Sequence, residues 1–355
     1  MTLAVNIAQG ASNNVTFRNR IINGACVIDQ RNAGASVSTS GNTFPVDRFK
    51  LQSGTSVSTM GRSTTAPSGF INSILYTVGT GASPAAGDAN RIYHQIEGLN
   101  CFNLAWGTSD AQAVTLSFWV RASVTGTYAV GFYGAGATVY SYITTYTISS
   151  ANTWTYITLT IPGPTVGTWP TDNSASINVN WDLGTGSTYQ STAGSWTAGT
   201  FWATSGSTKI VQTTGATFYI TGVQLEAGTT ASPFEYRQYG TELALCQRYY
   251  QQYSGSGNMV GAGLMQSATT AYRWGFPLGI AMRAVPTMTF NGDVRVWGGS
   301  GPNVASATST ISSQNNGTNY VEADLNCSGV TSTTGLFCKI YFNTTTANLA
   351  ISAEL

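Results

Sequence analysis

The sequence is poor in charged residues. Asp, Glu, Lys and Arg make up 8% of its 355 residues, against roughly 25% in an ordinary globular protein, and the formal net charge is +1. No basic run is present that could neutralise phosphates, so the composition argues against nucleic acid as a partner. A near-neutral surface rich in hydroxyls and aromatic rings favours uncharged polar partners such as sugars. The alternative is that sparse charge belongs to a surface that neighbouring molecules cover in an assembled particle.

Histidine is almost absent, since His94 is the only one. A histidine metal cluster is thereby excluded, and any Ser/His/Asp or Cys/His catalytic group would have to use this residue, which lies in a strand-like context typical of a structural histidine. The phosphate-binding Gly-x-x-x-x-Gly-Lys-Ser/Thr motif and the calcium-binding Asp-x-Asp-x-Asp-Gly pattern are also missing. We therefore predict no cofactor and no metal site.

One class of catalysis survives these absences, because a glycosidase needs only two carboxylates roughly 5–10 Å apart. The candidate carboxylates are Glu97, Asp110, Asp172 and Asp182. Asp172 and Asp182 are equally well explained as ordinary turn and strand-end residues, and the chain has no long parallel β-helix repeat of the kind that carries polysaccharide depolymerases. We expect no catalytic residues and no enzymatic activity.

Cysteines and long hydrophobic runs are scarce as well. The five cysteines are odd in number, irregularly spaced and without a Cys-x-x-Cys pair: Cys26, Cys101, Cys246, Cys327 and Cys338. We expect reduced, buried thiols, consistent with assembly in a cytoplasm, with a cross-strand pair of Cys327 and Cys338 as the alternative. No window approaches 18 apolar residues and the N-terminus lacks the features of a signal peptide, so no membrane insertion is predicted.

Alternation of apolar and polar residues is abundant. It recurs in five sets, each on one face of an extended strand: Val114, Leu116, Phe118, Val120; Tyr128, Val130, Phe132; Ile157, Leu159, Ile161; Ile177, Val179, Trp181, Leu183; and Phe218, Ile220, Val223 with a kink at Gly222. Six or more such strands, joined by Gly, Ser and Thr turns, predict an all-β fold. Residues 20–239 are expected to form a jelly-roll β-sandwich.

The spacing becomes helical after residue 240. Apolar side chains recur at i, i+3, i+7 and i+10, on Leu243, Cys246, Tyr250 and Tyr253, which predicts a linking helix over residues 240–253. A three-turn helix is marginal alone in water, so this face is predicted to form an oligomer interface. The alternative is a stiff linker that packs against its own sandwich.

The two ends of the chain differ from this middle part. Residues 254–355 are expected to form a smaller C-terminal β domain with strands at 273–278, 282–290 and 294–297. Its hydrophobic core would be small, so neighbouring subunits are expected to complete it. Residues 1–19 are polar and contain few core candidates. We interpret them as an attachment arm, with a frayed terminus as the alternative.

Several stretches resemble a single protein family. The longest is ITGVQLEAGTTASPFEYRQYGTELALCQRYYQQY, and upstream of it stand NRIINGACVIDQRNAG, FPVDRF, VTLSFWVRASVTGTY and ANTWTYITLTIPGPTVGTWPTDN, in that order. Together they cover roughly residues 19–253 and resemble bacteriophage tail-fibre-like virion structural proteins. The resemblance implies a carbohydrate-module-like jelly roll, a variable C-terminal domain, a homotrimer, and location in a virion assembled in the host cytoplasm.

Candidate glycan contacts follow from the chemistry of sugar recognition, which uses aromatic faces with polar groups at the rim. Glycine-rich segments carry the residues of that kind: Trp169, Asp172, Tyr189, Trp196 and Trp202, and Trp297 in the C-terminal domain. Burial under a long loop is the alternative for Trp196 and Trp202. Trp119 and Trp181 lie inside alternating strands, and we interpret them as structural.

The leading functional hypothesis is a non-enzymatic adhesin. Residues 1–19 would attach it to other virion proteins, and several identical weak sites would bind host cell-surface glycan or receptor together. A capsid decoration protein or head fibre without an adhesive role is the runner-up. A polysaccharide depolymerase is the third alternative.

Overall fold

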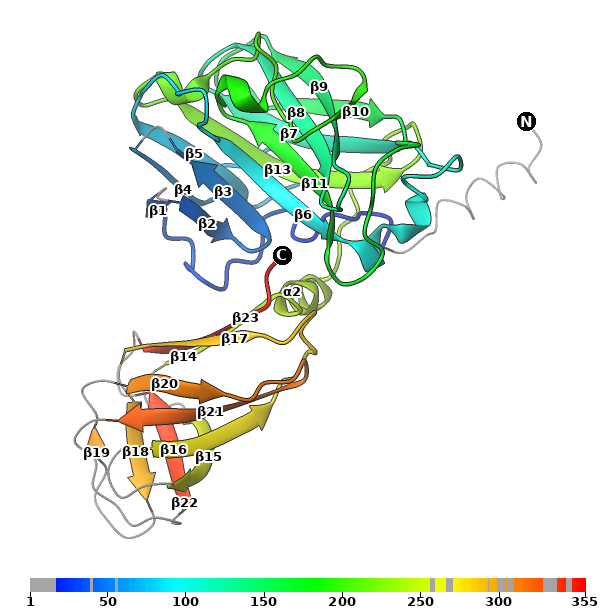
Figure 1. Cartoon of the computed structure of the whole chain (residues 1–355). Coiled ribbons are helices and arrows are strands. Elements are labelled where there is room, and N and C mark those ends of the chain that lie inside the picture. The colour runs from blue at the N-terminus through cyan, green and yellow to red at the C-terminus, as the bar shows by residue number, and fades with distance from the viewer. Residues whose placement is uncertain are drawn as a thin grey trace. The chain divides into compact units, whose positions relative to one another are not determined.

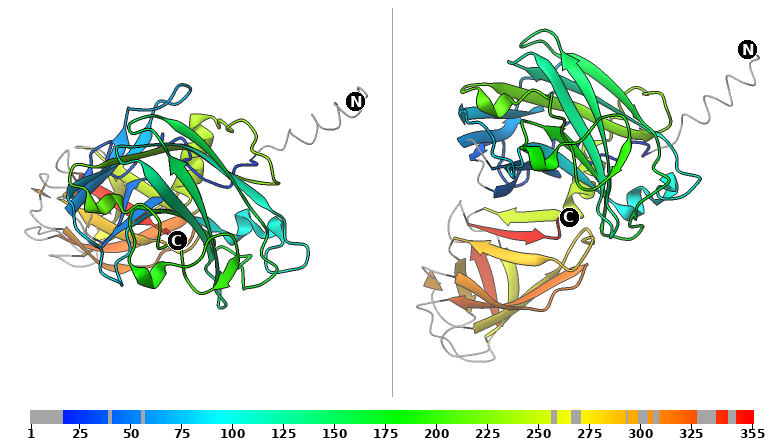
Figure 2. Two further views of the ribbon diagram at one scale, coloured as in Figure 1. Left: turned by 90° about the horizontal axis from the view of Figure 1, so that it is seen from above. Right: turned by 45° about the horizontal axis from the view of Figure 1, so that its top comes forward.

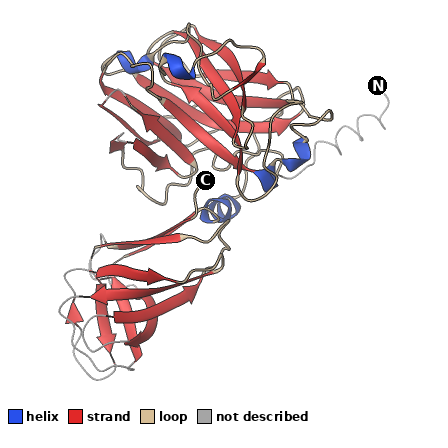
Figure 3. Cartoon of the chain, viewed as in Figure 1, coloured by secondary structure: helices blue, strands red, loops and turns tan. Residues whose placement is uncertain are grey.

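The computed structural model describes residues 17–38, 41–54, 57–255, 259–265, 271–292, 294–298, 304–305, 309–327, 337–342 and 347–355. The chain divides into two compact units, Met1–Glu242 and Leu243–Leu355. Strands dominate both units, and the described part holds one α-helix, α2 (Tyr239–Gln247) (Figures 1 and 3). The all-β prediction is confirmed.

Two antiparallel sheets build the first unit. The six-stranded sheet has the order β1 (Val37–Ser38), β4 (Val57–Ser63), β5 (Ser73–Thr80), β13 (Thr217–Ala227), β7 (Val114–Ala122), β10 (Thr155–Ile161). The second, called here the β6 sheet, has the order β12 (Trp196–Ala198), β9 (Tyr140–Ile148), β8 (Gly126–Gly134), β11 (Ala175–Asp182), β6 (Arg91–Glu97), β3 (Phe49–Ser53), β2 (Gly41–Val46). Short 3-10 turns lie at Gly98–Asn100, Phe102–Leu104, Ser187–Tyr189 and Ile210–Gln212.

The two sheets face each other as a jelly-roll β-sandwich around one core (Figures 1 and 2). Phe118 on the six-stranded sheet lies edge-to-face on Trp181 of the β6 sheet, with ring centroids 5.8 Å apart. The five alternating sets supply much of this core, and most of their members are less than 2% exposed. Period-two alternation buries one face of each strand, so this part of the architecture was predictable.

His94 lies in this core and is 1% exposed. Its ring is edge-on to Phe49 at 5.1 Å, and Nε2 lies 3.2 Å from the carbonyl oxygen of Ile22. Burial lowers the pKa of His94 well below its ordinary value, and the nearby cations of Arg48 and Arg237 lower it further. The interpretation of this histidine as structural fits these contacts.

The described cysteines are buried. Cys26 and Cys101 are free thiols, and burial raises the pKa of Cys26 to about 12 and that of Cys101 to about 11. Cys246 is 1% exposed. The side chains of Cys327 and Cys338 lie outside the described residues. Their strands are not neighbours in the sheet, which argues against the cross-strand pair considered above.

The N-terminal arm was predicted to reach residue 19, and this boundary is wrong. Asn19 is 4% exposed, and its side chain bonds the backbone of β13 through Val223 O at 3.1 Å and Leu225 N at 3.0 Å. An amide side chain that satisfies strand backbone belongs to the sandwich. Residues 1–16 of the predicted arm lie outside the described residues.

The linking helix is also shorter than predicted, ending at Gln247. The chain turns where Tyr249 N donates to Cys246 O, and β14 (Tyr250–Ser254) then pairs with β23 (Asn348–Ser352). Tyrosine side chains pack well on the pleated surface of a strand. Pairing of β14 with β23 therefore determines the structure at Tyr250 and Tyr253, although their spacing also fits a helix.

The second unit contains two further antiparallel sheets. One has the order β14, β23, β17 (Thr287–Asn291), and the other β19 (Val304–Ala305), β18 (Val294–Gly298), β22 (Phe337–Phe342), β15 (Met259–Met265), β16 (Ala271–Pro277), β21 (Tyr320–Cys327), β20 (Ser309–Gln314). Its own hydrophobic cluster includes Trp274, Met288, Phe342, Leu349 and Ile351.

Candidate functional site

Two of the predicted glycan contacts are part of an internal tryptophan cluster. Trp169 lies edge-to-face on Trp106 at 4.8 Å and on Trp196 at 5.6 Å, and Trp106 and Trp196 are also 5.6 Å apart. Each indole N–H donates to a backbone carbonyl: Trp106 to Gln112 O, Trp169 to Val166 O and Trp196 to Pro162 O. Trp169 is 8% exposed and Trp196 packs half-buried against the sandwich core. This cluster fixes loops at the sandwich end and offers little ring face to a ligand.

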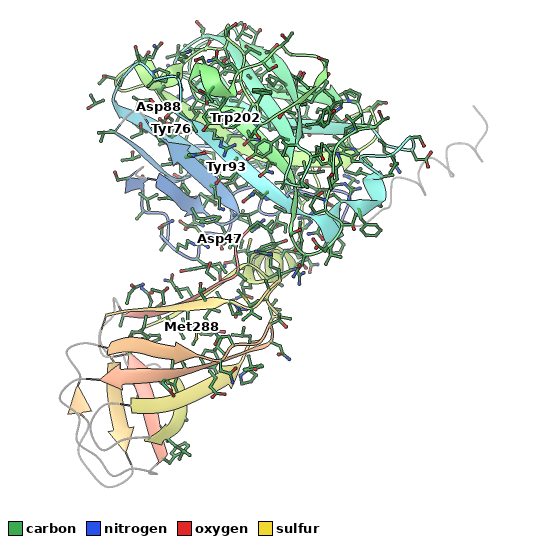
Figure 4. The ribbon with its side chains drawn as sticks, viewed as in Figure 1. Asp47, Tyr76, Asp88, Tyr93, Trp202 and Met288 are labelled. Carbon is green, nitrogen blue, oxygen red and sulfur yellow. The ribbon has the colours of Figure 1, made fainter. Side chains whose placement is uncertain are left out.

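Trp202 was predicted to contact glycan and is instead 1% exposed. It stacks on half-buried Tyr189 with centroids 4.3 Å apart, and the Arg91 guanidinium lies 4.0 Å from its ring centre. Its Nε1–H donates to Thr185 Oγ1 at 2.8 Å. A side chain at Gly131 would collide with the Trp202 backbone, so the Trp202 loop lies directly on the β6 sheet (Figure 4). Both faces of the indole are occupied, and the prediction is corrected.

The remaining predicted site residues do not lie together in one site. Asp172 is exposed in a turn, where hydrogen bonds from Ser174 N–H and Oγ–H lower its pKa. The side chain of Trp297 on β18 lies outside the described residues. Asp182, one of the carboxylates considered for catalysis, is buried, which raises its pKa, while hydrogen bonds from Ser207, Gly184 and Thr185 hold it in place.

A groove of about 720 Å³ lies elsewhere, on the outer face of the six-stranded sheet. Its aromatic lining is Phe70, Trp119, Tyr156, Phe234 and Tyr236, and Ser68, Ser117, Thr158, Thr230 and Ser232 contribute hydroxyl-bearing residues. No charged residue lines it. We call this feature the aromatic groove.

The floor of the aromatic groove comes from neighbouring strands. Trp119 on β7 and Tyr156 on β10 are cross-strand partners whose ring centroids lie 5.3 Å apart, and two residues along, Ser117 is the partner of Thr158. Because Phe118 and Ile157 point into the core, their neighbours in sequence must point outward. Tyr156 is 44% exposed, so part of its ring remains open to solvent.

A bulge in β13 makes room for these rings. The register of β13 against β7 shifts between Thr221 and Gln224, and Gly222 has φ +62°. A Cβ at Gly222 would lie 2.6 Å from Phe70 Cζ and 3.1 Å from Trp119 Cδ1. Glycine is therefore required both by the backbone and by the close approach of two groove rings. The kink expected at Gly222 is confirmed.

The wall of the aromatic groove is residues 230–236. Phe234 and Tyr236 pack on Phe70 with centroids 5.1 and 5.6 Å apart, and on each other at 4.9 Å. The Tyr236 hydroxyl donates to Gly69 O at 3.0 Å, which fixes a ring that is still 62% exposed.

Buried polar side chains anchor this wall to β13. Glu226 accepts hydrogen bonds from Ser232 N at 2.8 Å and Ser232 Oγ at 2.6 Å. The amide of Gln224 donates to Glu226 and to the Ser232 carbonyl and accepts from Glu235 N at 2.8 Å. Gln224 is fully buried and Glu226 is 5% exposed. Such a satisfied network gives the wall a single position.

The sequence contained the signal for the floor of the groove, although Trp119 was interpreted as structural. The same alternation that predicts Phe118 and Ile157 inside places Trp119 and Tyr156 outside on adjacent strands. Pairing of β7 with β10 and the fold of the wall join residues far apart in the chain, which no local pattern shows. The aromatic groove can stack on the apolar face of a neutral polar ligand and hydrogen-bond its rim.

The predicted oligomer interface is only partly available. Cys246 is 1% and Tyr250 6% exposed within the single chain, and Tyr253 lies edge-on to Phe276 at 5.3 Å in the second unit's cluster. Leu243 on α2 is half-buried. Cys246 and Tyr250 cannot serve as an intersubunit seam, so that assignment is corrected.

No group of three or more His, Cys, Asp or Glu side chains in the described residues could hold a metal ion. No described helix has the length and apolar character needed to cross a membrane.

No family model and no curated protein matches the sequence. Solved structures match at low identity. They include the enzymatically active domain of bacteriophage CBA120 tailspike protein 4 (14% identity, 60% of this chain, 22% of that chain, TM-score 0.31). A family 11 carbohydrate-binding module from Clostridium thermocellum, in complex with a mixed-linked tetrasaccharide, matches at 12% identity. The match covers 56% of this chain and 100% of that chain, with a TM-score of 0.28. The tandem CBM22 domain of Paenibacillus barcinonensis Xyn10C matches at 10% identity. The match covers 91% of this chain and 98% of that chain, with a TM-score of 0.29.

The match to the tailspike covers only 22% of that protein's length.

Proposed function

We propose that this chain is a non-enzymatic structural protein of a bacteriophage virion, a tail-fibre-like adhesin that binds neutral host-surface glycan in the aromatic groove. One observation carries the binding proposal: half-buried and exposed aromatic rings and hydroxyl-bearing residues line a groove of about 720 Å³ that has no charged lining residue. The virion assignment is supported by the resemblance of residues 19–253 to tail-fibre-like proteins, and the groove wall lies inside the longest resembling stretch.

The chemistry of binding follows from the lining. A pyranose presents C–H groups on one face and hydroxyls at its edge, so the Trp119 and Tyr156 rings would stack on the face while Thr158 and Thr230 bond the edge. Neutral lining favours neutral sugars over sialic or uronic acids, because a carboxylate would lose hydration without gaining a cation.

The test is a binding panel of neutral gluco-, galacto- and manno-oligosaccharides and their N-acetylated forms, with sialylated and uronate-containing glycans alongside. Trp119→Ala and Tyr156→Ala are each expected to weaken binding of the best neutral glycan about tenfold, in the range for a stacked aromatic contact. Tyr219→Ala is the matched control, because Tyr219 contacts Trp154 and Arg121 outside the groove lining. Preference for acidic glycans, or equal losses in the control, would contradict the assignment.

The proposal includes assembly. Weak single sites become effective when several engage one surface, so we propose a homotrimer attached to other virion proteins through residues 1–16. Leu243 and Tyr253, both half-buried, are the members of the predicted interface that remain available. Light scattering gives the mass directly, and a monomer at micromolar concentration would refute the trimer without affecting the groove.

A further inference from the structure

The groove wall is tied to the beginning of the described chain by one carboxylate. Glu235 Oε1 accepts from Phe17 N at 2.7 Å and from Arg18 N at 3.3 Å, and Oε2 accepts from Asn19 N at 2.9 Å. Phe17 has φ +67°, a left-handed conformation. Successive N–H groups converging on one point form an anion-binding nest, and here a side chain 218 residues away in sequence fills it.

Further bonds join the same two segments. The Arg18 guanidinium donates to Pro233 O at 2.7 Å. Arg237 donates in the opposite direction, to the carbonyls of Asn19 and Ile21, and lies 3.3 Å from Glu235 Oε2. The contacts therefore run both ways between residues 17–21 and residues 233–237.

These bonds matter for the groove because its wall has no regular structure of its own. Residues 228–238 belong to no helix or strand. Glu235 stands between Phe234 and Tyr236, the two rings that the wall contributes to the groove, and its N–H is held by Gln224. An irregular segment fixed mainly by side-chain anchors moves when an anchor is removed.

We propose that Glu235 is a positioning residue for glycan binding, and that the segment Phe17–Asn19 is a required part of the binding site although it does not line the groove. This rests on the proposed function of the aromatic groove. The entry segment orients Phe234 and Tyr236 through the Glu235 carboxylate. Glycan affinity therefore depends on residues directly next to the proposed attachment arm.

A double-mutant cycle tests this. The two changes are Glu235→Gln and removal of residues 1–18, which deletes two of the three amide donors but leaves Asn19. Each alone is expected to weaken binding of the panel's best neutral oligosaccharide about tenfold, the factor set by one charge-assisted hydrogen bond. Combined, they are expected to weaken it by clearly less than the product of the two factors, because Glu235 is the acceptor for both amides that the truncation deletes, while the Arg18 bond to Pro233 O is lost only in the truncated chain. Removal of residues 1–16 and Asp110→Asn, an exposed carboxylate, are the controls.

Hydrogen exchange of residues 230–236 in the free protein gives a second readout. Both variants should accelerate it, with the sandwich strands unchanged. Additive losses in the cycle, unchanged affinity, or unchanged exchange in the wall would each overturn the inference. If the unmutated chain binds no glycan, the proposed function fails, and the exchange measurement still decides whether Glu235 positions the wall.

Discussion

Trp119 and Tyr156 face each other across two neighbouring strands, as direct partners with ring centroids 5.3 Å apart on the outer face of the sandwich. Trp202 and Trp169, which stand in glycine-rich loops, are buried. Trp181 on β11 points into the core and is buried as well, so the outward-facing position of Trp119 on its strand makes this ring available to a ligand.

Trp202→Ala should be a stability variant and not a binding variant. Removing a fully buried tryptophan typically costs about 3–5 kcal/mol of unfolding free energy. It would also leave Thr185 Oγ1 without the indole N–H donor and the Arg91 guanidinium without the ring on which it packs. We expect a lower midpoint in urea unfolding with glycan affinity unchanged under conditions where the protein is folded. A clear loss of affinity at full folding would restore Trp202 as a contact residue.

Gly222→Ala should damage the groove. The new Cβ would meet Phe70 and Trp119, and a non-glycine residue at this positive φ adds strain of about 1–3 kcal/mol. We expect reduced stability together with reduced glycan affinity, measured by calorimetry. Gly215→Ala is the matched control, since Gly215 has φ +76° and open space around it. If both variants lose stability alike and neither loses affinity, the bulge does not shape the site.

The pH dependence of stability should report His94. Its pKa in the folded chain is lowered, whereas the unfolded chain takes up the proton near pH 6.5. The stabilisation from keeping His94 neutral is therefore present above about pH 6.5 and is lost as pH falls towards the folded pKa, at about 1.4 kcal/mol per pH unit.

Urea unfolding between pH 6.5 and 5 measures this slope. His94→Gln keeps a donor for Ile22 O and should remove that part of the slope, whatever its effect on absolute stability. Because the sequence has one histidine, parallel slopes in both proteins would show that His94 is not the responsible group.

Removing residues 1–16 should leave the melting temperature unchanged while abolishing incorporation into particles. Removal of residues 1–19 should instead destabilise the sandwich, because it deletes the buried Asn19 side chain that bonds Val223 and Leu225. Thermal unfolding and mass spectrometry of assembled particles check the two halves. Normal incorporation of the shorter chain would remove the attachment role.

The limits of prediction from sequence are visible in particular residues. Strand faces were predictable because burial on one face leaves a period of two, as at Val114 to Val120. The linking helix was predicted to be too long because the position of Tyr250 fits a helical spacing and a strand equally well. Only its pairing with Ser352, which is distant in sequence, shows that Tyr250 belongs to a strand. The aromatic groove was not predicted because tryptophans in loops were favoured over those in strands, and because Glu235 in its wall bonds residues 17–19, more than two hundred positions away in sequence.

The most direct test of glycan binding in the aromatic groove is a titration that follows the indole N–H signals of the nine tryptophans by NMR. Each signal is assigned by a single Trp→Phe variant, and the titrant is the best neutral oligosaccharide of the panel. If the aromatic groove binds glycan, the Trp119 signal shifts and saturates with the binding isotherm, while those of Trp169, Trp196 and Trp202 stay in place. Saturable shifts at Trp196 or Trp202 with Trp119 unmoved would contradict binding in the aromatic groove.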